Sequence, residues 1–194
     1  MAIFEKQVIF SNCTFKNQAD FQHSDFESTC DMSGSLFAEE IDFQHADFRG
    51  SALFTECVFE AESDFQHVDF GEEAHFSNAE FQRETDFQHT DFKDKADFSG
   101  CKFSRETDFQ HTNFKGFASF RGAQFYGETD FQHTDFTNGI DFSSAIFHEE
   151  VDMQHASFKG EVNLNGLDFL DDVDFEHAKV NNQSFKDYYK KKDY

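Results

Sequence analysis

Proline and tryptophan are absent from the 194-residue sequence, and glycine occurs only 10 times. Linkers between domains are usually rich in proline, glycine and small polar residues, so this composition gives no sign of a domain boundary and indicates one unit. Long apolar runs are also missing, because no segment approaches the ~20 consecutive apolar residues of a membrane-spanning helix. The first six residues lack the basic start and apolar stretch of a signal peptide. We therefore expect no membrane association and a cytoplasmic location.

Basic residues are scarce. The chain has 16 Lys and Arg against 39 Asp and Glu, which gives a formal net charge of −23. Nucleic acids and anionic membranes repel such a chain, so we expect neither as a partner and expect binding to basic protein surfaces instead. The four cysteines, Cys13, Cys30, Cys57 and Cys101, form no C-x-x-C pattern of a metal or redox site.

Phenylalanine is the residue that the sequence has in excess, with 31 copies. The copies recur at alternating intervals of five and six residues, as in 37, 43, 48, 54, 59, 65 and 70, and the few substitutes (Met32, Met153, Leu164 and Val180) are all apolar. Neither the 3.6-residue period of a helix nor the two-residue period of a long strand produces this spacing. It predicts four short segments per turn, each of which sends one Phe inward, with a full period of 22 residues.

A second set of inward positions lies two residues before each Phe. Small or β-branched residues fill these positions, and all four cysteines are among them. Cys13, Cys57 and Cys101 fall on one column, two coils apart, or roughly 10 Å at the ~4.8 Å strand spacing. That separation is too long for a disulfide, so we interpret the cysteines as small buried fillers.

The repeating unit resembles the pentapeptide repeat, a tandem of a small residue, Asp or Asn, Leu or Phe, and two further residues. It appears here as Ala19-Asp20-Phe21-Gln22-His23 and Thr129-Asp130-Phe131-Gln132-His133. The sequence departs from the family pattern by using Phe almost everywhere and by inserting a sixth residue into every second unit. The resemblance implies an all-β fold, a right-handed quadrilateral β-helix (β-solenoid), here of about eight coils of 22 residues.

One face of each predicted coil is nearly constant along the chain. Its second position is always Asp: Asp20, Asp42, Asp64, Asp86, Asp108, Asp130, Asp152 and Asp174. Its fifth position is always His: His23, His45, His67, His89, His111, His133, His155 and His177. Between them lies Gln, from Gln22 to Gln154, with Glu176 in the last coil. Stacked at roughly 4.8 Å, these residues predict ladders along one edge of the rod.

Two interpretations of the ladders stay open, one structural and one chemical. In the first, Asp accepts turn N–H groups, Gln amides stack into a ladder, and neutral His donates to an Asp or a carbonyl. In the second, the His residues form a metal array, but parallel side chains on a flat face converge poorly on a tetrahedral ion. We therefore favour the structural interpretation and predict neither a metal nor a cofactor.

Acidic residues surround this face. The position just before it is occupied by Glu40, Glu62, Glu84, Glu106, Glu128, Glu150 and Asp172, and the next face begins with Asp25, Asp47, Asp69, Asp91 and Asp135. The Asp, His and Glu columns are our candidate interaction surface. Because Asp and His are periodic here, whereas an active site is a singular arrangement, and because no nucleophile elbow or phosphate loop is present, we predict that the protein is not an enzyme.

The C-terminal residues leave the repeat. Phe185 comes one residue early, and the chain continues with lysines and with Tyr188, Tyr189 and Tyr194. We predict a solenoid over residues 1–184 and a cap or docking tail over residues 185–194. A solenoid exposes its core at an uncapped end, so we also predict a homodimer through one end, with these four aromatic residues as the candidate contacts or cap.

The function predicted from the sequence is a non-catalytic, acidic protein-interaction or scaffold module whose protein partner the sequence does not name. The alternative comes from the family resemblance, because some pentapeptide-repeat proteins mimic DNA and bind a type II topoisomerase such as gyrase, which they inhibit or protect from quinolones. The acidic columns support this alternative, but fold alone does not fix function.

Overall fold

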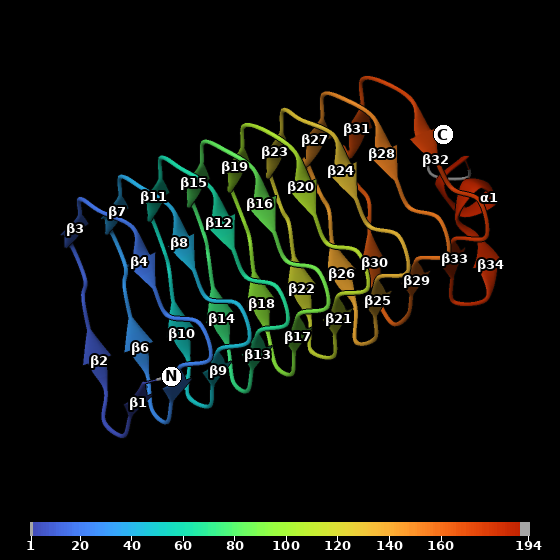
Figure 1. Ribbon diagram of the computed structural model, residues 1–194. Helices are drawn as coiled ribbons and strands as arrows, with labels where there is room; N and C mark the ends of the chain where they lie inside the picture. The colour runs from blue at the N-terminus through green and yellow to red at the C-terminus, as the bar shows by residue number, and fades with distance from the viewer. Residues whose placement is uncertain (1, 191–194) are drawn as a thin grey trace.

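The computed structural model describes residues 2–190, which form one continuous rod (Figure 1). Two-residue strands succeed one another along the chain and collect into four parallel sheets, one on each side of the rod. Strands one coil apart pair in strict 22-residue register, as in Asp69↔Asp91 and Phe70↔Phe92. The fold is the predicted right-handed quadrilateral β-helix. Its right-handed path agrees with the general rule for connections between parallel strands.

The first sheet carries the constant sequence motif, and we call it the acidic face. Its strands are β4 (Ala19–Asp20), β8 (Ile41–Asp42), β12 (Ser63–Asp64), β16 (Thr85–Asp86), β20 (Thr107–Asp108), β24 (Thr129–Asp130), β28 (Val151–Asp152) and β32 (Val173–Asp174). The second face follows it in each coil. Its strands are β1 (Ile3–Phe4), β5 (Asp25–Phe26), β9 (Asp47–Phe48), β13 (Asp69–Phe70), β17 (Asp91–Phe92), β21 (Asn113–Phe114), β25 (Asp135–Phe136), β29 (Ser157–Phe158), β33 (Lys179–Val180) and β34 (Gln183–Ser184).

The other two faces complete each coil. The third face consists of β2 (Val8–Ile9), β6 (Cys30–Asp31), β10 (Ala52–Leu53), β14 (Ala74–His75), β18 (Ala96–Asp97), β22 (Ala118–Ser119), β26 (Ile140–Asp141) and β30 (Val162–Asn163). The fourth face consists of β3 (Thr14–Phe15), β7 (Leu36–Phe37), β11 (Val58–Phe59), β15 (Glu80–Phe81), β19 (Lys102–Phe103), β23 (Gln124–Phe125), β27 (Ile146–Phe147) and β31 (Asp168–Phe169).

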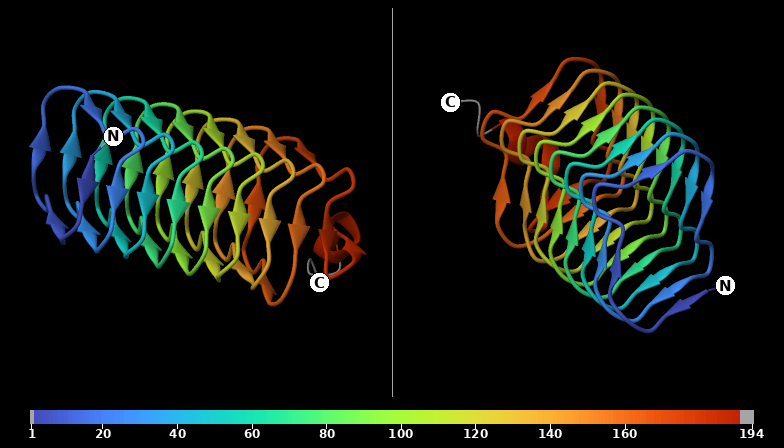
Figure 2. Two further views of the ribbon diagram at one scale, coloured as in Figure 1. Left: turned by 60° about the horizontal axis from the view of Figure 1, so that its bottom comes forward. Right: turned by 90° about the vertical axis from the view of Figure 1, so that its left-hand side faces the viewer.

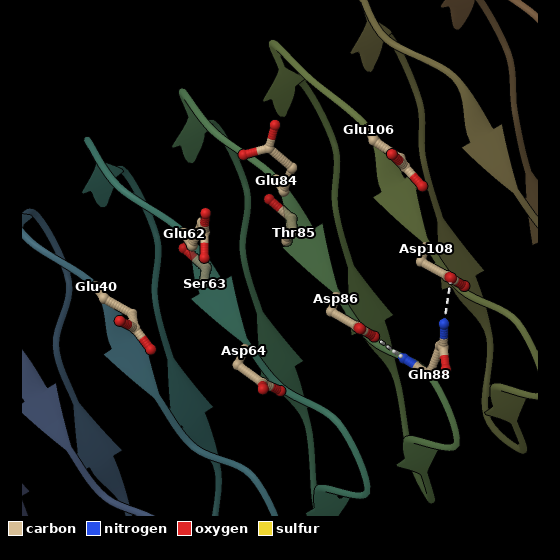
Figure 3. Close-up of a pocket in the computed structure, with 10 residues that line it drawn as sticks. All are labelled: Glu40, Glu62, Ser63, Asp64, Glu84, Thr85, Asp86, Gln88, Glu106 and Asp108. Atoms are coloured by element: carbon tan, nitrogen blue, oxygen red, sulfur yellow. Dashed lines mark hydrogen bonds between the residues drawn. The ribbon is translucent and has the colours of Figure 1, made fainter.

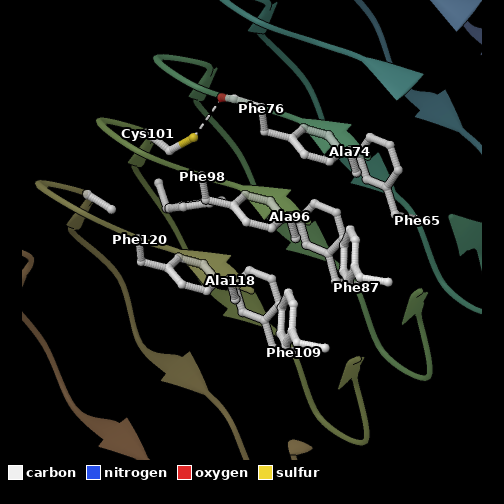
Figure 4. Close-up of a cluster of buried hydrophobic side chains, with 14 of the residues drawn as sticks. Phe65, Ala74, Phe76, Phe87, Ala96, Phe98, Cys101, Phe109, Ala118 and Phe120 are labelled. Carbon is white, nitrogen blue, oxygen red and sulfur yellow. Dashed lines mark hydrogen bonds between the residues drawn. The ribbon is translucent and has the colours of Figure 1, made fainter. Parts of the chain in front are cut away.

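The core is a set of phenylalanine stacks that run along the rod (Figure 4). Rings on the same face lie parallel in successive coils, as in Phe87–Phe109, whose centroids are 5.0 Å apart at 1°. Rings on opposite faces meet edge to face across the core, as in Phe87–Phe98, at 5.4 Å and 85°. Both arrangements are favoured by the aromatic quadrupole, so each ring is held along the rod and across it.

The second inward set is small because it packs beside these rings. Ala74, Ala96 and Ala118 are fully buried. The Cys101 thiol is also buried and donates to the Phe76 carbonyl at 2.9 Å, and burial raises the pKa of the Cys57 thiol to about 12, which makes it unreactive. Cys13, in the first coil, is the exception to the predicted burial, because it is exposed.

The two ends of the rod differ (Figure 2). At the C-terminal end the chain reverses after β33, β34 pairs with it in antiparallel fashion, and α1 (Phe185–Lys190) lies over the last coils. At the other end Ile3 and Ile9 are exposed and Phe4 and Phe10 are only partly buried. No helix within residues 2–190 is long and apolar enough to cross a membrane.

Candidate functional site: the acidic face and its histidine column

The aspartates of the acidic face are fixed by the turn that follows each strand. In every coil the Asp Oδ1 accepts the backbone N–H of the residue two positions later, from 2.6 Å at Asp130 to 2.9 Å at Asp42. The same bond recurs at Asp20, Asp64, Asp86, Asp108, Asp152 and Asp174. Asp suits this position because its short carboxylate reaches a turn N–H directly, and the column is held rigidly as a result.

The glutamines tie each coil to the next. The predicted Gln-to-Gln amide ladder is wrong at all steps but one, Gln44 to Gln66 (3.1 Å). At the other steps the Gln amide donates to the Asp Oδ2 of the following coil, for example from Gln132 to Asp152 at 2.7 Å. The same pairing holds for Gln22, Gln66, Gln88, Gln110 and Gln154. A charged acceptor gives the stronger hydrogen bond, so the amide prefers the carboxylate to another amide.

Several carboxylates of this column are hard to ionise. Partial burial raises the pKa of Asp64 to about 6, and the neighbouring charges of Asp42 and Asp86 add to the shift. Burial and the charges of its neighbours likewise raise the pKa of Asp130 to about 6. Asp64 is also the carboxylate that receives no amide from the preceding coil, because Gln44 donates to Gln66 instead. The folded state therefore carries a penalty for its ionised form at neutral pH.

We expect Asp64→Asn to stabilise the protein by about 1 kcal/mol at pH 7.5, a figure discounted for solvent screening of a half-buried group. Asn keeps an acceptor for the Gln66 N–H and removes the repelled charge. Because the folded pKa is raised, the penalty in the wild type fades as the pH falls through about 6. Urea unfolding at pH 7.5 and pH 5 should therefore show an advantage of the variant that is clearly smaller at the lower pH.

Asp97 on the third face provides the matched control. Its pKa is lowered, because hydrogen bonds from Ser99 and Lys95 together outweigh the opposing effect of burial. Asp97→Asn should therefore lose stability at pH 7.5. If both variants lost stability equally, the assignment of a charge penalty to the acidic face would be wrong.

The glutamate column borders an open groove along the same face (Figure 3). The groove has a volume of about 330 Å³, and carboxylates from both columns line it: Glu40, Glu62, Asp64, Glu84, Asp86, Glu106 and Asp108. A second groove of about 220 Å³ continues past Glu128, Asp130, Glu150 and Asp152. Except for Glu40, which is partly buried, the glutamates named here are exposed, so their charges face solvent.

Basic side chains form ion pairs on the neighbouring face but not on the acidic face. On the second face Arg49 pairs with Asp25 and Asp47, and Lys93 and Lys115 pair with the aspartates of that column. Within residues 2–190 no Lys or Arg forms an ion pair with the Asp or Glu column of the acidic face. The uncompensated negative charge is therefore concentrated on one side of the rod, whereas the column that begins at Asp25 is partly balanced.

The histidines occupy a turn position that the sequence alone did not reveal. Each His has a positive φ, for example 57° at His89, and the turn closes with a hydrogen bond such as Thr90 N–H to Phe87 O at 3.2 Å. That geometry marks the third residue of a type II turn, where Gly or Asn is favoured. The corner after the third face has the same turn and does use Gly34, Gly100 and Asn78. Comparing the residues of these two columns in the sequence could have identified the turn position of the histidines.

The imidazoles are exposed and stack on one another in a continuous column. Ring centroids from His23 to His177 are 4.7–4.9 Å apart. Within residues 2–190 no imidazole of the column donates to an Asp or a backbone carbonyl; a contact of the His177 ring with Glu176 at 3.3 Å is the one carboxylate pairing. No group of three or more His, Cys, Asp or Glu within this range could hold a metal ion.

Two imidazoles in the histidine column have a lowered pKa, so their protonation is unfavourable. Partial desolvation and the neighbouring imidazoles lower the pKa of His67 and of His111. A lowered folded pKa means that stability is fully present above the unfolded value near 6.5 and is lost as the pH falls below it. The raised pKa of Asp64 acts in the opposite direction, so these effects offset each other in mildly acidic solution.

The candidate residues at the C-terminal end are packed to different degrees. Phe185 is fully buried, and its ring lies 4.8 Å from that of Phe175. Tyr188 and Tyr189 are partly buried, and their hydroxyls donate to the carbonyls of Val162 and Leu167 at 3.2 and 3.4 Å. Tyr194 lies outside the described residues.

Comparison with known proteins identifies the repeat. Residues 2–47, 43–91, 87–135 and 131–179 match the family model described as pentapeptide repeats (9 copies). The chain therefore belongs to the pentapeptide-repeat family, as its sequence predicted. No curated protein matches it at a significant level.

Two solved structures match the chain over most of its length. Both are of trypsin-treated QnrB1, a plasmid-mediated fluoroquinolone resistance protein. One has 16% identity and a TM-score of 0.37, over 94% of this chain and 92% of that one. The other has 17% identity and a TM-score of 0.25, over 91% of each chain.

Proposed function

We propose that the protein is a non-catalytic rod whose acidic face binds a basic surface of a partner protein. The observation that carries this proposal is that the Asp and Glu columns of this face form no ion pair with Lys or Arg, while carboxylates of the other faces do. The turn and amide hydrogen bonds hold the Asp carboxylates in place, so a partner meets a preorganised row of charge beside the exposed glutamates. The cytoplasmic location expected from the sequence stays a prediction.

Neutralising three exposed glutamates of the acidic face tests this proposal. We expect Glu84→Gln, Glu106→Gln and Glu128→Gln together to weaken binding of a lysine-rich probe peptide by about tenfold at low salt, since three screened pairs contribute roughly 0.5 kcal/mol each. The measurement is fluorescence anisotropy of the labelled peptide at two salt concentrations, and the affinity of the wild type should fall as salt rises.

A matched variant controls for net charge. Glu56→Gln, Glu72→Gln and Glu161→Gln make the same change of charge at exposed positions on other corners of the rod. This control should retain most of the wild-type affinity. Equal losses in the two triple variants would mean that overall charge, rather than the acidic face, determines binding.

DNA mimicry is the second candidate function. Two carboxylate columns at ~4.8 Å spacing give about one charge per 2.4 Å of the rod, close to the one per ~1.7 Å of duplex DNA. The likeness supports binding to the DNA-binding groove of a type II topoisomerase. The test is DNA supercoiling by gyrase with added protein, with and without a quinolone; inhibition or protection that fades with salt supports mimicry, and no effect at any concentration tested excludes it.

The homodimer through one end also stays a prediction. The N-terminal end offers an apolar surface, because Ile3 and Ile9 are 57% and 62% exposed. Residues 2–18 carry Glu5 against Lys6 and Lys16, so two such ends would meet with little repulsion although the whole chain is acidic.

A further inference from the structure

Three side chains at one corner of the rod break the polar surface. Tyr126, His148 and Leu170 directly follow β23, β27 and β31, so they occupy the same position in successive coils. Their backbones are in register, since His148 N–H donates to Phe125 O and Leu170 N–H donates to Phe147 O. Tyr126 and His148 stack at 4.4 Å and 18°. We call these three residues the corner strip.

The corner strip is confined to the last third of the rod. The same column holds Lys16, Ala38, Glu60, Gln82 and Ser104 in the earlier coils. Tyr126 is 46% exposed and Leu170 is 58% exposed. Apart from Ile3 and Ile9 at the N-terminal end, they are the exposed large apolar side chains of residues 2–190. They lie two coils apart, with His148 on the coil between them, so the three side chains form one contiguous patch, which is more informative than isolated exposure.

Carboxylates border the corner strip on the side of the acidic face. Glu128, Glu150 and Asp172 lie two residues after its members, and Glu149 and Asp171 lie one residue after two of them. All five of these carboxylates are exposed. The groove of about 220 Å³ lined by Glu128 and Glu150 runs beside it. An apolar patch thus lies next to a charged groove, the arrangement of a binding hot spot with a polar rim.

His148 holds the middle of the corner strip in a defined orientation. Its Nε2 lies 3.2 Å from the Gln124 Oε1, and its ring is stacked on Tyr126. An aromatic side chain that is already ordered loses little conformational entropy when a ligand covers it, so less binding energy is spent on ordering the site.

We propose that the corner strip and the adjacent carboxylates bind an extended basic peptide segment of a partner protein that carries one large apolar side chain. This inference rests on the proposed function and adds its anchor: the carboxylates select the basic residues by charge complementarity, and the corner strip takes the apolar residue. Because an aromatic anchor is typically worth more than exposed charge pairs, the corner strip contributes specificity that charge alone does not supply.

Two synthetic probe peptides test this proposal. In one, lysines alternate with serines around a central tryptophan; in the other, alanine replaces the tryptophan. We expect the wild type to bind the tryptophan peptide about tenfold more tightly than the alanine peptide, measured by fluorescence anisotropy. The double variant Tyr126→Ser and Leu170→Ser should bind both peptides with the affinity that the wild type has for the alanine peptide. Gln82→Ser, in the same column of an earlier coil, is the matched control and should behave as the wild type.

The outcomes separate this inference from the proposed function. If the wild type binds both peptides equally, the acidic face binds basic segments and the corner strip is not an anchor. If neither peptide binds, the proposed function fails and this inference fails with it. A tryptophan preference that persists in the double variant would place the anchor elsewhere and overturn the proposal. Circular dichroism of each variant establishes that the exposed substitutions leave the fold intact.

Discussion

Replacing Phe98 by alanine is expected to lower the free energy of unfolding by about 4 kcal/mol. Phe98 is fully buried at the middle of the rod. Its ring stacks between those of Phe76 and Phe120 at 4.8 and 4.9 Å and meets Phe87 and Phe109 edge to face. The truncation removes contacts along the rod and across it, and the rigid coils around it cannot collapse to fill the cavity.

Chemical denaturation of Phe98→Ala, followed by circular dichroism, measures this loss. Phe98→Leu retains most of the volume and should lose less than about 2 kcal/mol. Phe4→Ala at the N-terminal end should also be mild, because Phe4 is only partly buried and its ring stacks on that of Phe26 alone. A loss at Phe98→Ala no larger than at Phe4→Ala would contradict the view that stacking inside the rod is the main source of its stability.

The architecture was predictable because one repeated residue type determines it. The 5-6-5-6 spacing of Phe fits one arrangement of the chain, a coil with four short segments. A buried position can be recognised in the sequence because every residue that occupies it is apolar, as Met32 and Leu164 illustrate. The acidic columns were predictable for the same reason. In a strict 22-residue register, residues 22 positions apart in the sequence are neighbours in space.

The chemistry on the surface was less predictable. Spacing places Gln above Gln, but the longer reach of the side chain lets Gln132 bond to Asp152 instead. The spacing also shows where charged residues lie but not which of them form ion pairs. The ion pair between Arg49 and Asp25 could therefore not be predicted. Exposure at the corners depends on side-chain direction, and for this reason the anchor role that we propose for Tyr126 was not foreseen.

In the histidine column the backbone conformation favours glycine, whereas the contacts between coils favour an aromatic ring. A non-glycine residue in the left-handed region costs roughly 1 kcal/mol, and His89 adopts φ 57° there. Gly100, at the equivalent corner after the third face, avoids that cost. The stacking of neighbouring imidazoles at 4.8 Å offsets part of it, since each ring covers the next. The column therefore combines a strained turn with favourable ring contacts that a glycine column could not make.

Phe185→Ala should uncover the C-terminal end of the core. The Phe185 ring packs 4.8 Å from that of Phe175 and 4.9 Å from that of Phe158, and its backbone N–H donates to the Ala178 carbonyl. Loss of the ring is expected to cost about 3 kcal/mol. Because each coil of a solenoid contacts only its neighbours, the damage should stay local.

Hydrogen exchange followed by mass spectrometry distinguishes a local from a global effect. In Phe185→Ala we expect faster exchange over residues 151–190 and unchanged exchange near Phe98, since end coils open independently of the middle of the rod. Lys186→Ala, at an exposed position of the same helix, is the matched control and should leave exchange unaltered. Uniformly faster exchange along the whole rod would mean that the coils unfold as one unit, and α1 would then stabilise every coil at once rather than only the coils that it covers.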